Sequence, residues 1–205
     1  MSRPMTVLLT GFEPFDGDSV NASWLAVQAV ARAWRGPDLL TAELPVSFGR
    51  APQVLWDRLQ AVRPDVVVCV GEAGGRSHVG IERVAVNVAD AELADNDGAW
   101  PVDAPVVLGG PVGYLTGLPL RACLAAAKGT GVPTEISGTA GTYVCNATFY
   151  ALMDALTGMP GVRGGFVHLP RTPDQAGGGP AMTSADAARA LAAVLAAAGR
   201  PANVG

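Results

Sequence analysis

The stretch VVVCV, residues 66–70, is an unbroken run of small and branched apolar side chains. Such a run is typical of a strand that is buried on both faces of a parallel sheet. Further short strands are expected at residues 6–10, 134–137 and 165–168. Between the strands, apolar residues recur at three- and four-residue spacing, which predicts helices over residues 21–34, 51–62, 118–128, 143–156 and 184–198. Strands that alternate with helices predict an α/β fold with a mostly parallel sheet and a ligand crevice at the carboxyl ends of its strands.

Length and composition favour one domain of this class. The chain has 205 residues, of which 49% are hydrophobic and 16% charged, so we expect a single domain over residues 1–205 with a sizeable core. The net charge is −4 and the 14 Lys and Arg residues are scattered, which argues against a nucleic-acid partner. The apolar run at residues 7–9 is too short for a signal peptide or a membrane span, so we expect no membrane association.

Two segments interrupt the alternation of strands and helices. Residues 89–117 are rich in Asp, Asn, Gly and Pro around the brief apolar run at residues 105–108. This composition predicts a hairpin or a long loop with a role in function or assembly. A glycine-rich loop at residues 175–180 is either a mobile flap or a plain surface connection.

The reactive side chains are few. An odd number of cysteines (Cys69, Cys123 and Cys145) without an export signal indicates free thiols in a reducing compartment, so we expect a cytoplasmic protein. The histidines are His78 and His168, and no Cys-x-x-Cys or His-Glu-x-x-His spacing occurs. We therefore expect neither a metal nor a cofactor.

Cys145 has the most distinctive surroundings of the three thiols. A predicted strand and the turn at residues 138–141 precede a helix that begins near Tyr143. In the first turn of a helix, unpaired backbone N–H groups would stabilise a thiolate and could hold an oxyanion. The alternative is a small core residue, which the surroundings alone favour for Cys145 and also for Cys69 and Cys123.

His168 and Glu82 are the candidate partners of this thiol. His168 stands at the carboxyl end of a predicted central strand, where α/β enzymes place catalytic groups. Glu82 lies in the alternating stretch at residues 79–87, with Arg83 on the opposite side, and could orient the histidine. Position alone leaves open a histidine that is merely hydrogen-bonded at a strand end and a surface glutamate beside an arginine.

Six ordered motifs indicate a family. SGTAGTYVCN, residues 137–146, closely resembles the nucleophile motif of the type I pyroglutamyl peptidases, also called pyrrolidone carboxyl peptidases. The other motifs resemble the family's N-terminal loop, second-strand, glutamate, central-loop and histidine segments, and they are GFEPFDG (11–17), LPVSFG (44–49), GEAGGRSHVGIERVAVN (71–87), DNDG (95–98) and GGFVHLP (164–170). Six motifs in order are much harder to obtain by chance than one. The resemblance implies a three-layer α/β/α domain with a twisted sheet, and a homo-oligomer, either a tetramer or a dimer.

The resemblance also implies an activity, which is hydrolysis of the amide bond after an N-terminal pyroglutamyl residue. Cys145 matches the nucleophile, His168 the general acid and base, and Glu82 the carboxylate that orients the histidine. The substrates would be peptides with N-terminal pyroglutamate. The residues assigned to the pocket for the flat lactam ring are Phe12, Phe15, Glu72, Tyr143 and Val144.

Three positions depart from the family pattern. Glu72 stands where Gln is usual, Gly80 where Ser or Thr is usual, and Glu92 where Arg is frequent. Because a carboxylate only accepts hydrogen bonds, Glu72 should pair with the lactam N–H or turn towards Arg76 or another cation. If it faces the pocket, replacement by Gln should raise catalytic efficiency.

Two other functions compete with this activity. One is a catalytically weak or lapsed member of the family that binds pyroglutamyl or other cyclic-amide groups. The other is a phosphorylase or nucleosidase on a related α/β scaffold, which rests on fold analogy alone.

Overall fold

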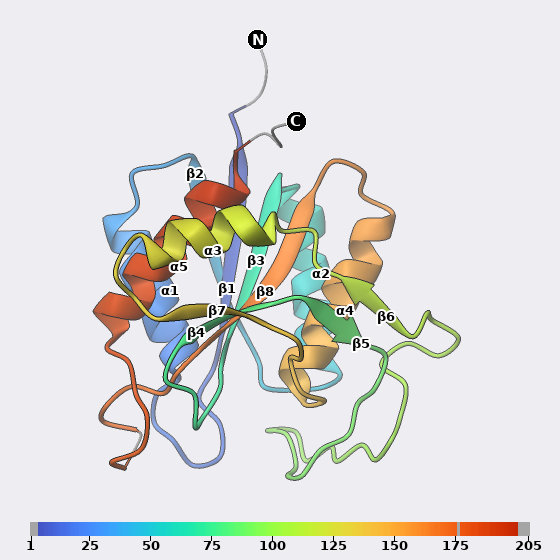
Figure 1. Ribbon diagram of the computed structural model, residues 1–205. Coiled ribbons are helices and arrows are strands. Elements are labelled where there is room, and N and C mark those ends of the chain that lie inside the picture. The colour runs from blue at the N-terminus through green and yellow to red at the C-terminus, as the bar shows by residue number, and fades with distance from the viewer. Residues whose placement is uncertain (1–3, 176, 201–205) are drawn as a thin grey trace.

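The computed structural model describes residues 4–175 and 177–200. Within these residues, a six-stranded sheet has the order β2-β1-β3-β8-β4-β7, and its strands cross the centre of Figure 1. The strands are β1 (Thr6–Phe12), β2 (Asp38–Leu44), β3 (Val66–Glu72), β4 (Val79–Glu82), β7 (Thr134–Ser137) and β8 (Arg163–Leu169). Both β1 and β3 are buried along their whole length, as expected for central strands of a parallel sheet.

The direction of β4 is the main feature that the sequence did not predict. The β2, β1, β3 and β8 strands run parallel, whereas β4 is antiparallel to β8 and parallel to β7. The prediction of an α/β fold with a mostly parallel sheet is therefore confirmed. The rule that places a site at the carboxyl ends of strands applies to β1, β3 and β8 but not to β4, because β4 ends towards the opposite edge.

The five helices of the described residues agree with the predicted segments to within two residues at either end. They are α1 (Ala22–Ala33), α2 (Arg50–Val62), α3 (Leu120–Lys128), α4 (Val144–Thr157) and α5 (Ser184–Ala198). Asn21 caps α1 by accepting from the Ser23 N–H, and Thr183 caps α5 by accepting from the Asp186 N–H. Such caps satisfy N–H groups that the helix itself leaves unpaired.

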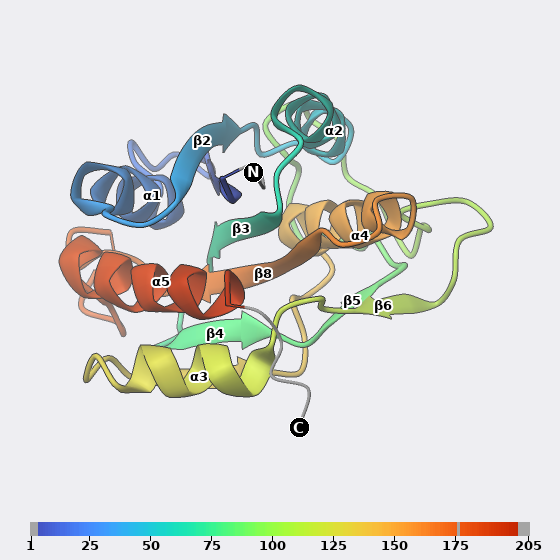
Figure 2. The ribbon, with the colours of Figure 1, turned by 90° about the horizontal axis from the view of Figure 1, so that it is seen from above.

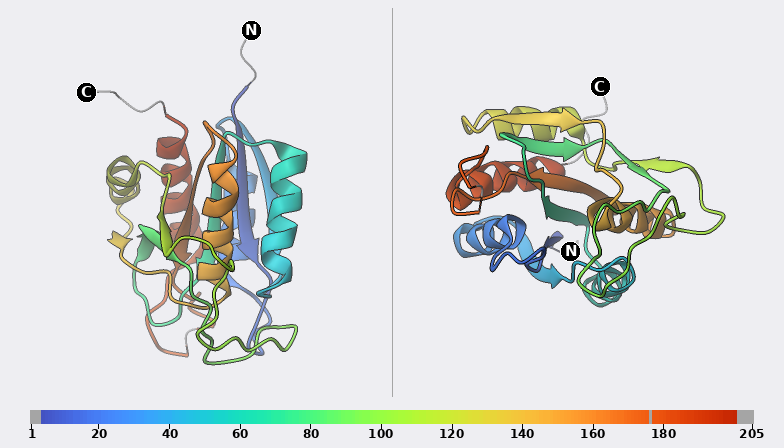
Figure 3. Two further views of the ribbon diagram at one scale, coloured as in Figure 1. Left: turned by 90° about the vertical axis from the view of Figure 1, so that its right-hand side faces the viewer. Right: turned by 90° about the horizontal axis from the view of Figure 1, so that it is seen from below.

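Helices cover both faces of the sheet, as Figures 2 and 3 show from three directions. The α1, α3 and α5 helices pack on one face and α2 and α4 on the other. Along β3, Val66, Val68 and Val70 belong to the core beneath the first group, and Val67 and Cys69 belong to the core beneath the second. This alternation, which follows from the two-residue period of a strand, produces the three layers implied by the family resemblance.

The segment after Glu82 leaves the main sheet. The β5 (Val84–Val86) and β6 (Gly113–Leu115) strands form a separate antiparallel pair beside α4. The predicted hairpin or long loop therefore takes the form of a long connection that returns as β6. The apolar run at residues 105–108 does not form a strand.

The LPVSFG motif begins at the end of the second strand. The resemblance assigns it to the family's second-strand segment, and its first residue, Leu44, is the last residue of β2. The remaining residues of the motif form the connection to α2, because Pro45 has no N–H to continue the ladder. This connection places Val46 and Phe48 near the site described below.

Candidate active site

Cys145 occupies the first turn of α4. The chain reaches this helix from β7 through a turn in which Gly141 has a φ of 76°, a conformation that favours glycine. The N-cap residue, Tyr143, is extended and makes no side-chain capping hydrogen bond. The first-turn N–H groups of α4 are therefore left uncapped beside the thiol, where they can stabilise negative charge.

A buried asparagine fixes this end of α4. The Asn146 side chain accepts from the Val86 N–H at 3.0 Å and donates to the carbonyls of Val86 and Val88, both at 2.9 Å. It is fully buried. These bonds join the helix that carries Cys145 to β5, so the nucleophile is held by two elements rather than one.

Gly71 brings the thiol onto the sheet face that carries His168. A Cβ at Gly71 would lie 2.8 Å from Cys145 Sγ and 2.9 Å from the Phe166 ring. Gly71 is in register with His168 of the neighbouring parallel strand, and residues in register project to the same face of a sheet. The thiol therefore lies over β3, on the sheet face that carries the imidazole of His168. It occupies space that any larger residue at position 71 would fill.

Glu82 binds the imidazole of His168 from the other side. His168 Nδ1 lies 2.8 Å from Glu82 Oε1, and the exposed fractions of the two side chains are 5% and 0%. Because a carboxylate only accepts hydrogen bonds, Nδ1 carries the proton and Nε2 is left as the basic nitrogen. Gly80 is in register with His168, so Glu82 reaches the ring diagonally across the β4–β8 pair.

Protonation of the site follows from its burial. Burial raises the pKa of Glu82, but hydrogen bonds from His168 and Arg76 outweigh it and hold this pKa below its usual value. Burial lowers the pKa of His168 against the pull of Glu82. Burial also raises the pKa of Cys145 to about 12, with Glu82 and Glu72 adding to the rise and Arg76 opposing it. The favoured resting form is thus a neutral thiol, a neutral imidazole and an anionic Glu82.

The other two cysteines are enclosed in the core. Cys69 and Cys123 are fully buried, whereas Cys145 retains some exposure. Burial raises the pKa of Cys69 to about 12 and that of Cys123 to about 11. Neither is placed to meet a substrate, in keeping with the core interpretation made from sequence.

An aromatic cavity of about 40 Å³ lies beside Cys145. Phe15 and Tyr143 face each other with ring centroids 6.3 Å apart, and Phe48 meets Tyr143 edge-on at 5.3 Å. All five residues predicted for the pocket lie on its wall, which is formed by Phe12, Phe15, Asn21, Val46, Glu72, Tyr143, Val144 and Cys145. Its small volume and flat walls suit a small planar group.

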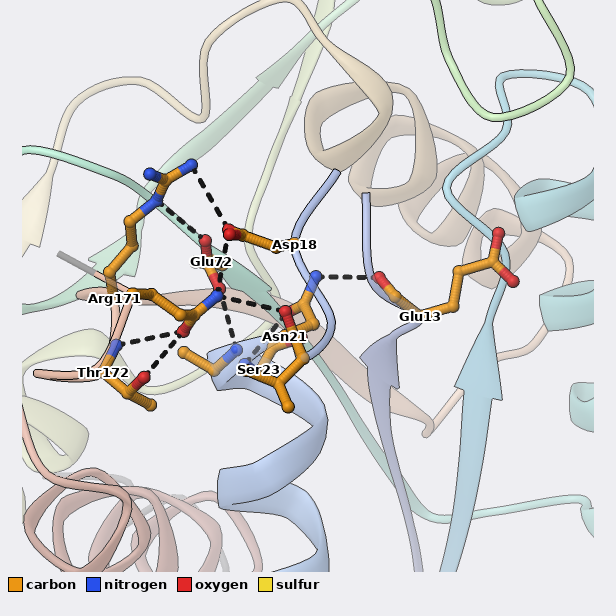
Figure 4. A network of polar contacts seen from close by, with 10 residues as sticks. Glu13, Asp18, Asn21, Ser23, Glu72, Arg171 and Thr172 are labelled. Atoms are coloured by element: carbon orange, nitrogen blue, oxygen red, sulfur yellow. Dashed lines mark hydrogen bonds and ion pairs between the residues drawn. The ribbon is translucent and has the colours of Figure 1, made fainter. Parts of the chain in front are cut away.

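Glu72 lines the cavity, and its carboxylate is bound in a polar network (Figure 4). Its Oε2 accepts from the Ala22 N–H at 2.8 Å and from Gln175 Nε2 at 3.0 Å, and its Oε1 accepts from Arg171 Nε at 3.1 Å. Asp18 lies 3.7 Å from Arg171 and accepts from Gln175 at 3.2 Å. Of the two alternatives expected for Glu72, the structure has the pairing with a cation, and the cation is Arg171 rather than Arg76.

Comparison with known proteins decides the family. A sequence model of the family described as pyroglutamyl peptidase matches residues 5–201. The chain is 50% identical to a pyrrolidone-carboxylate peptidase of Clavibacter michiganensis, over 93% of this chain and 91% of that one. The chain belongs to the pyroglutamyl peptidase family. The family resemblance predicted from the six motifs is confirmed.

Solved structures of the pyroglutamyl peptidase family share the fold. The pyroglutamyl peptidase I of Bacillus amyloliquefaciens superposes with a TM-score of 0.92 at 40% identity, covering 96% of this chain and 95% of that one. The pyrrolidone carboxyl peptidase of Thermococcus litoralis gives a TM-score of 0.88 at 33% identity, covering 95% and 93%. The α/β fold is therefore the family's fold along almost the whole chain.

The other two departures from the family pattern differ in their surroundings. Glu92 is exposed and is not part of the cavity wall beside Cys145. Gly80 lies beneath the Arg76 guanidinium, and a Cβ there would be 2.5 Å from Arg76 Nη1. Position 80 therefore bears on the charge environment of Glu82, whereas position 92 does not touch the cavity.

Sequence reasoning did not single out four residues of this site. Gly71, Asn146 and Phe48 lie within the quoted motifs without an assigned role, and Arg76 is expected only as a possible partner of Glu72. A glycine at the end of an otherwise apolar strand is a usable signal for Gly71. The other three act through long-range contacts that have no local signature.

Two other kinds of site are absent from the residues that the structure describes. These residues contain no group of three or more His, Cys, Asp or Glu side chains arranged to hold a metal ion. None of their helices is long and apolar enough to cross a bilayer.

Proposed function

We propose that this protein is a cysteine peptidase that hydrolyses the amide bond after an N-terminal pyroglutamyl residue, with Cys145 as nucleophile, His168 as acid and base, and Glu82 as the orienting carboxylate. The observation that carries the proposal is the convergence on one sheet face of a helix N-terminal thiol and a buried His168–Glu82 pair at 2.8 Å. A thiol, an imidazole and an orienting carboxylate in this arrangement suit nucleophilic acyl transfer.

The first half of the reaction forms a thioester. As Cys145 Sγ attacks the pyroglutamyl carbonyl carbon, its proton passes to His168 Nε2. The transfer accompanies the attack because the raised pKa of Cys145 and the lowered pKa of His168 disfavour an ion pair beforehand. First-turn N–H groups of α4 hold the carbonyl oxygen as it becomes negative. His168 then protonates the departing amine, and the C–N bond breaks.

The second half releases pyroglutamate. His168 Nε2 accepts a proton from water, whose oxygen attacks the thioester carbonyl, and the returning proton restores the Cys145 thiol. Throughout, Glu82 keeps the Nδ1 proton in place and stabilises the imidazolium that forms in each half.

The pocket supports a preference for a blocked terminus. Its walls carry Phe15 and Tyr143, and the carboxylate of Glu72 is already bonded to protein donors. An uncharged lactam ring can enter such a pocket, whereas an ordinary N-terminal ammonium group would lose its hydration without a free partner.

The test is hydrolysis of pyroglutamyl p-nitroanilide, with prolyl and glutamyl p-nitroanilides as controls. We expect release of nitroaniline from the pyroglutamyl compound and little from the others. The competing function, binding of cyclic amides without turnover, predicts a measurable Kd for a pyroglutamyl peptide with no release. Equal rates on all three anilides would reject the proposed specificity.

We further propose that the protein self-associates, as a tetramer or a dimer, through residues 89–117. This segment exposes large apolar side chains next to the β5–β6 pair, and they are Leu93, Trp100, Val102, Leu108, Val112 and Leu115. Exposed apolar surface of this kind favours an interface over contact with water. Sedimentation of the protein and of a Leu108→Glu, Val112→Glu variant tests the proposal, and a monomer at micromolar concentration would reject it.

We also propose that the protein works in the cytoplasm as one domain. Free Cys69, Cys123 and Cys145 and a thiol-based reaction both suit a reducing compartment. Cell fractionation tests the location, and a single calorimetric transition tests the domain count.

A further inference from the structure

Arg76 makes the second contact to the carboxylate of Glu82. It lies in the connection between β3 and β4, and its Nη1 donates to Glu82 Oε1 at 2.9 Å. This is the same oxygen that binds His168 Nδ1 at 2.8 Å. The Arg76 side chain is 24% exposed and Glu82 is fully buried, so the guanidinium reaches in from the surface to a carboxylate that solvent does not touch.

The same guanidinium reaches the connection that leads to the nucleophile. Arg76 Nη2 donates to the Thr139 carbonyl at 3.2 Å, and Thr139 lies in the turn between β7 and Cys145. One planar cation therefore joins the orienting carboxylate of the site to the turn before α4. The fixed geometry of guanidinium donors suits such a two-point contact better than an ammonium group would.

Gly80 makes this position available to Arg76. A Cβ on Gly80 would lie 2.5 Å from Arg76 Nη1 but an ordinary 3.5 Å from Glu82 Oε1. A methyl group at position 80 would therefore displace the end of the arginine and leave the carboxylate in place. Position 80 is in register with His168. It has to lack a side chain if Arg76 is to keep its contact with Glu82.

No other cation of the described residues is placed to do the same. Arg171 binds Glu72 and faces Asp18, and His78 binds Glu135 at 2.8 Å. Arg83 follows Glu82 in the chain, but its side chain is exposed. The charged and titratable groups around the Cys145 thiol include His168, Tyr143, Glu82, Glu72, Cys69 and Arg76. Among those that shift its pKa, Arg76 is the cation that lowers it.

We propose that Arg76 is a positioning residue for the reaction, which holds Glu82, and through it His168, in the productive orientation, and that Gly80 is the residue that admits it. This inference rests on the proposed function. Its charge also acts on the site, since it lowers the pKa of Cys145 and that of His168. Removing the charge should therefore move both pKa values, and both limbs of the pH profile, upward.

The experiment compares four variants: Arg76→Gln, Arg76→Lys, Gly80→Ala and, as a matched control, Arg83→Gln, which removes an exposed arginine next to Glu82. Arg76→Gln should lower kcat by about tenfold or more with little change in KM, as loss of an outer contact to a reacting group does. The pH profile of kcat/KM should shift upward. Arg76→Lys should keep the profile near its original position, and Arg83→Gln should change neither kcat nor the profile.

Gly80→Ala displaces the Arg76 guanidinium without removing it, so it tests whether the position of Arg76 matters as well as its presence. It should reproduce much of the Arg76→Gln defect, and the double variant should be no worse than Arg76→Gln alone, because both changes remove one contact. Additive losses in the double variant would overturn the link between Gly80 and Arg76. A loss of kcat without any shift of the pH profile in Arg76→Gln would overturn the role of the charge.

A second readout is independent of turnover. The rate of Cys145 alkylation by iodoacetamide, followed by mass spectrometry against pH, reports formation of the thiolate. Its midpoint should move upward in Arg76→Gln and stay in place in Arg76→Lys. An unmoved midpoint would overturn the inference about Arg76, whereas failure of the unmodified protein to hydrolyse pyroglutamyl p-nitroanilide would overturn only the proposed function.

Discussion

Replacing Glu72 with Gln should destabilise the protein and should not improve catalysis. In the structure both carboxylate oxygens of Glu72 are occupied, Oε2 by Ala22 and Gln175 and Oε1 by Arg171. A glutamine has one oxygen and one NH₂ group at the same place. If its oxygen serves Ala22 and Gln175, its NH₂ group must face the guanidinium of Arg171, and one charge-assisted hydrogen bond is lost.

The size of this loss follows from the burial of the two partners. A hydrogen bond to a charged group contributes about 1.5–3 kcal/mol. The Glu72 side chain is 1% exposed but Arg171 is 31% exposed, so solvent screening and the nearby Asp18 reduce the cost to about 1–2 kcal/mol. For a chain of this length, that cost lowers Tm by roughly 2–8 °C.

Thermal unfolding of Glu72→Gln, Arg171→Gln and the double variant measures the effect. The double variant should lose less than the sum of the single losses, because each single change already breaks the pair. Arg50→Gln, which breaks an exposed pair with Asp97, should lower Tm less than Glu72→Gln does. An unchanged Tm in Glu72→Gln together with a higher kcat/KM would refute this reasoning and would mean that the carboxylate faces the substrate.

Three further predictions concern the thiols and the carboxylate of the site. Cys145→Ser should abolish nitroaniline release while leaving the circular dichroism spectrum unchanged, and residual turnover above a few percent would contradict the assignment. Glu82→Gln should lower kcat more than it raises KM, because Glu82 orients His168 rather than the lactam; steady-state kinetics distinguish the two. Folding raises the pKa of Cys69 from about 9 to about 12, so its contribution to stability is complete below pH 9 and is lost as pH rises towards 12. In Cys69→Ala, the unfolding free energy should therefore fall less steeply with pH across this range, by up to about 1.4 kcal/mol per pH unit. Urea titrations at several pH values that show the same fall in both proteins would contradict this prediction.

The sequence by itself determined the helices, the strands β1, β3, β7 and β8, and the family. Apolar runs of period two and helical repeats of three and four residues are local properties, so the α/β class, the five helices and the ends of α5 could be predicted from them. The positions of Cys145 at a helix start and His168 at a strand end followed for the same reason. The roles of these residues and of Glu82 came from the resemblance of six motifs, not from position.

Only the tertiary structure decided which residues meet. The antiparallel direction of β4 brings Glu82 diagonally to His168, and no local pattern specifies the direction in which a strand enters a sheet. Glu72 pairs with Arg171, 99 residues away, and Arg76 binds Glu82. Packing and charge select such partners over long sequence separations. The free energy of a buried ion pair depends on the distance between its two charged groups and on their burial, and only the folded chain sets both.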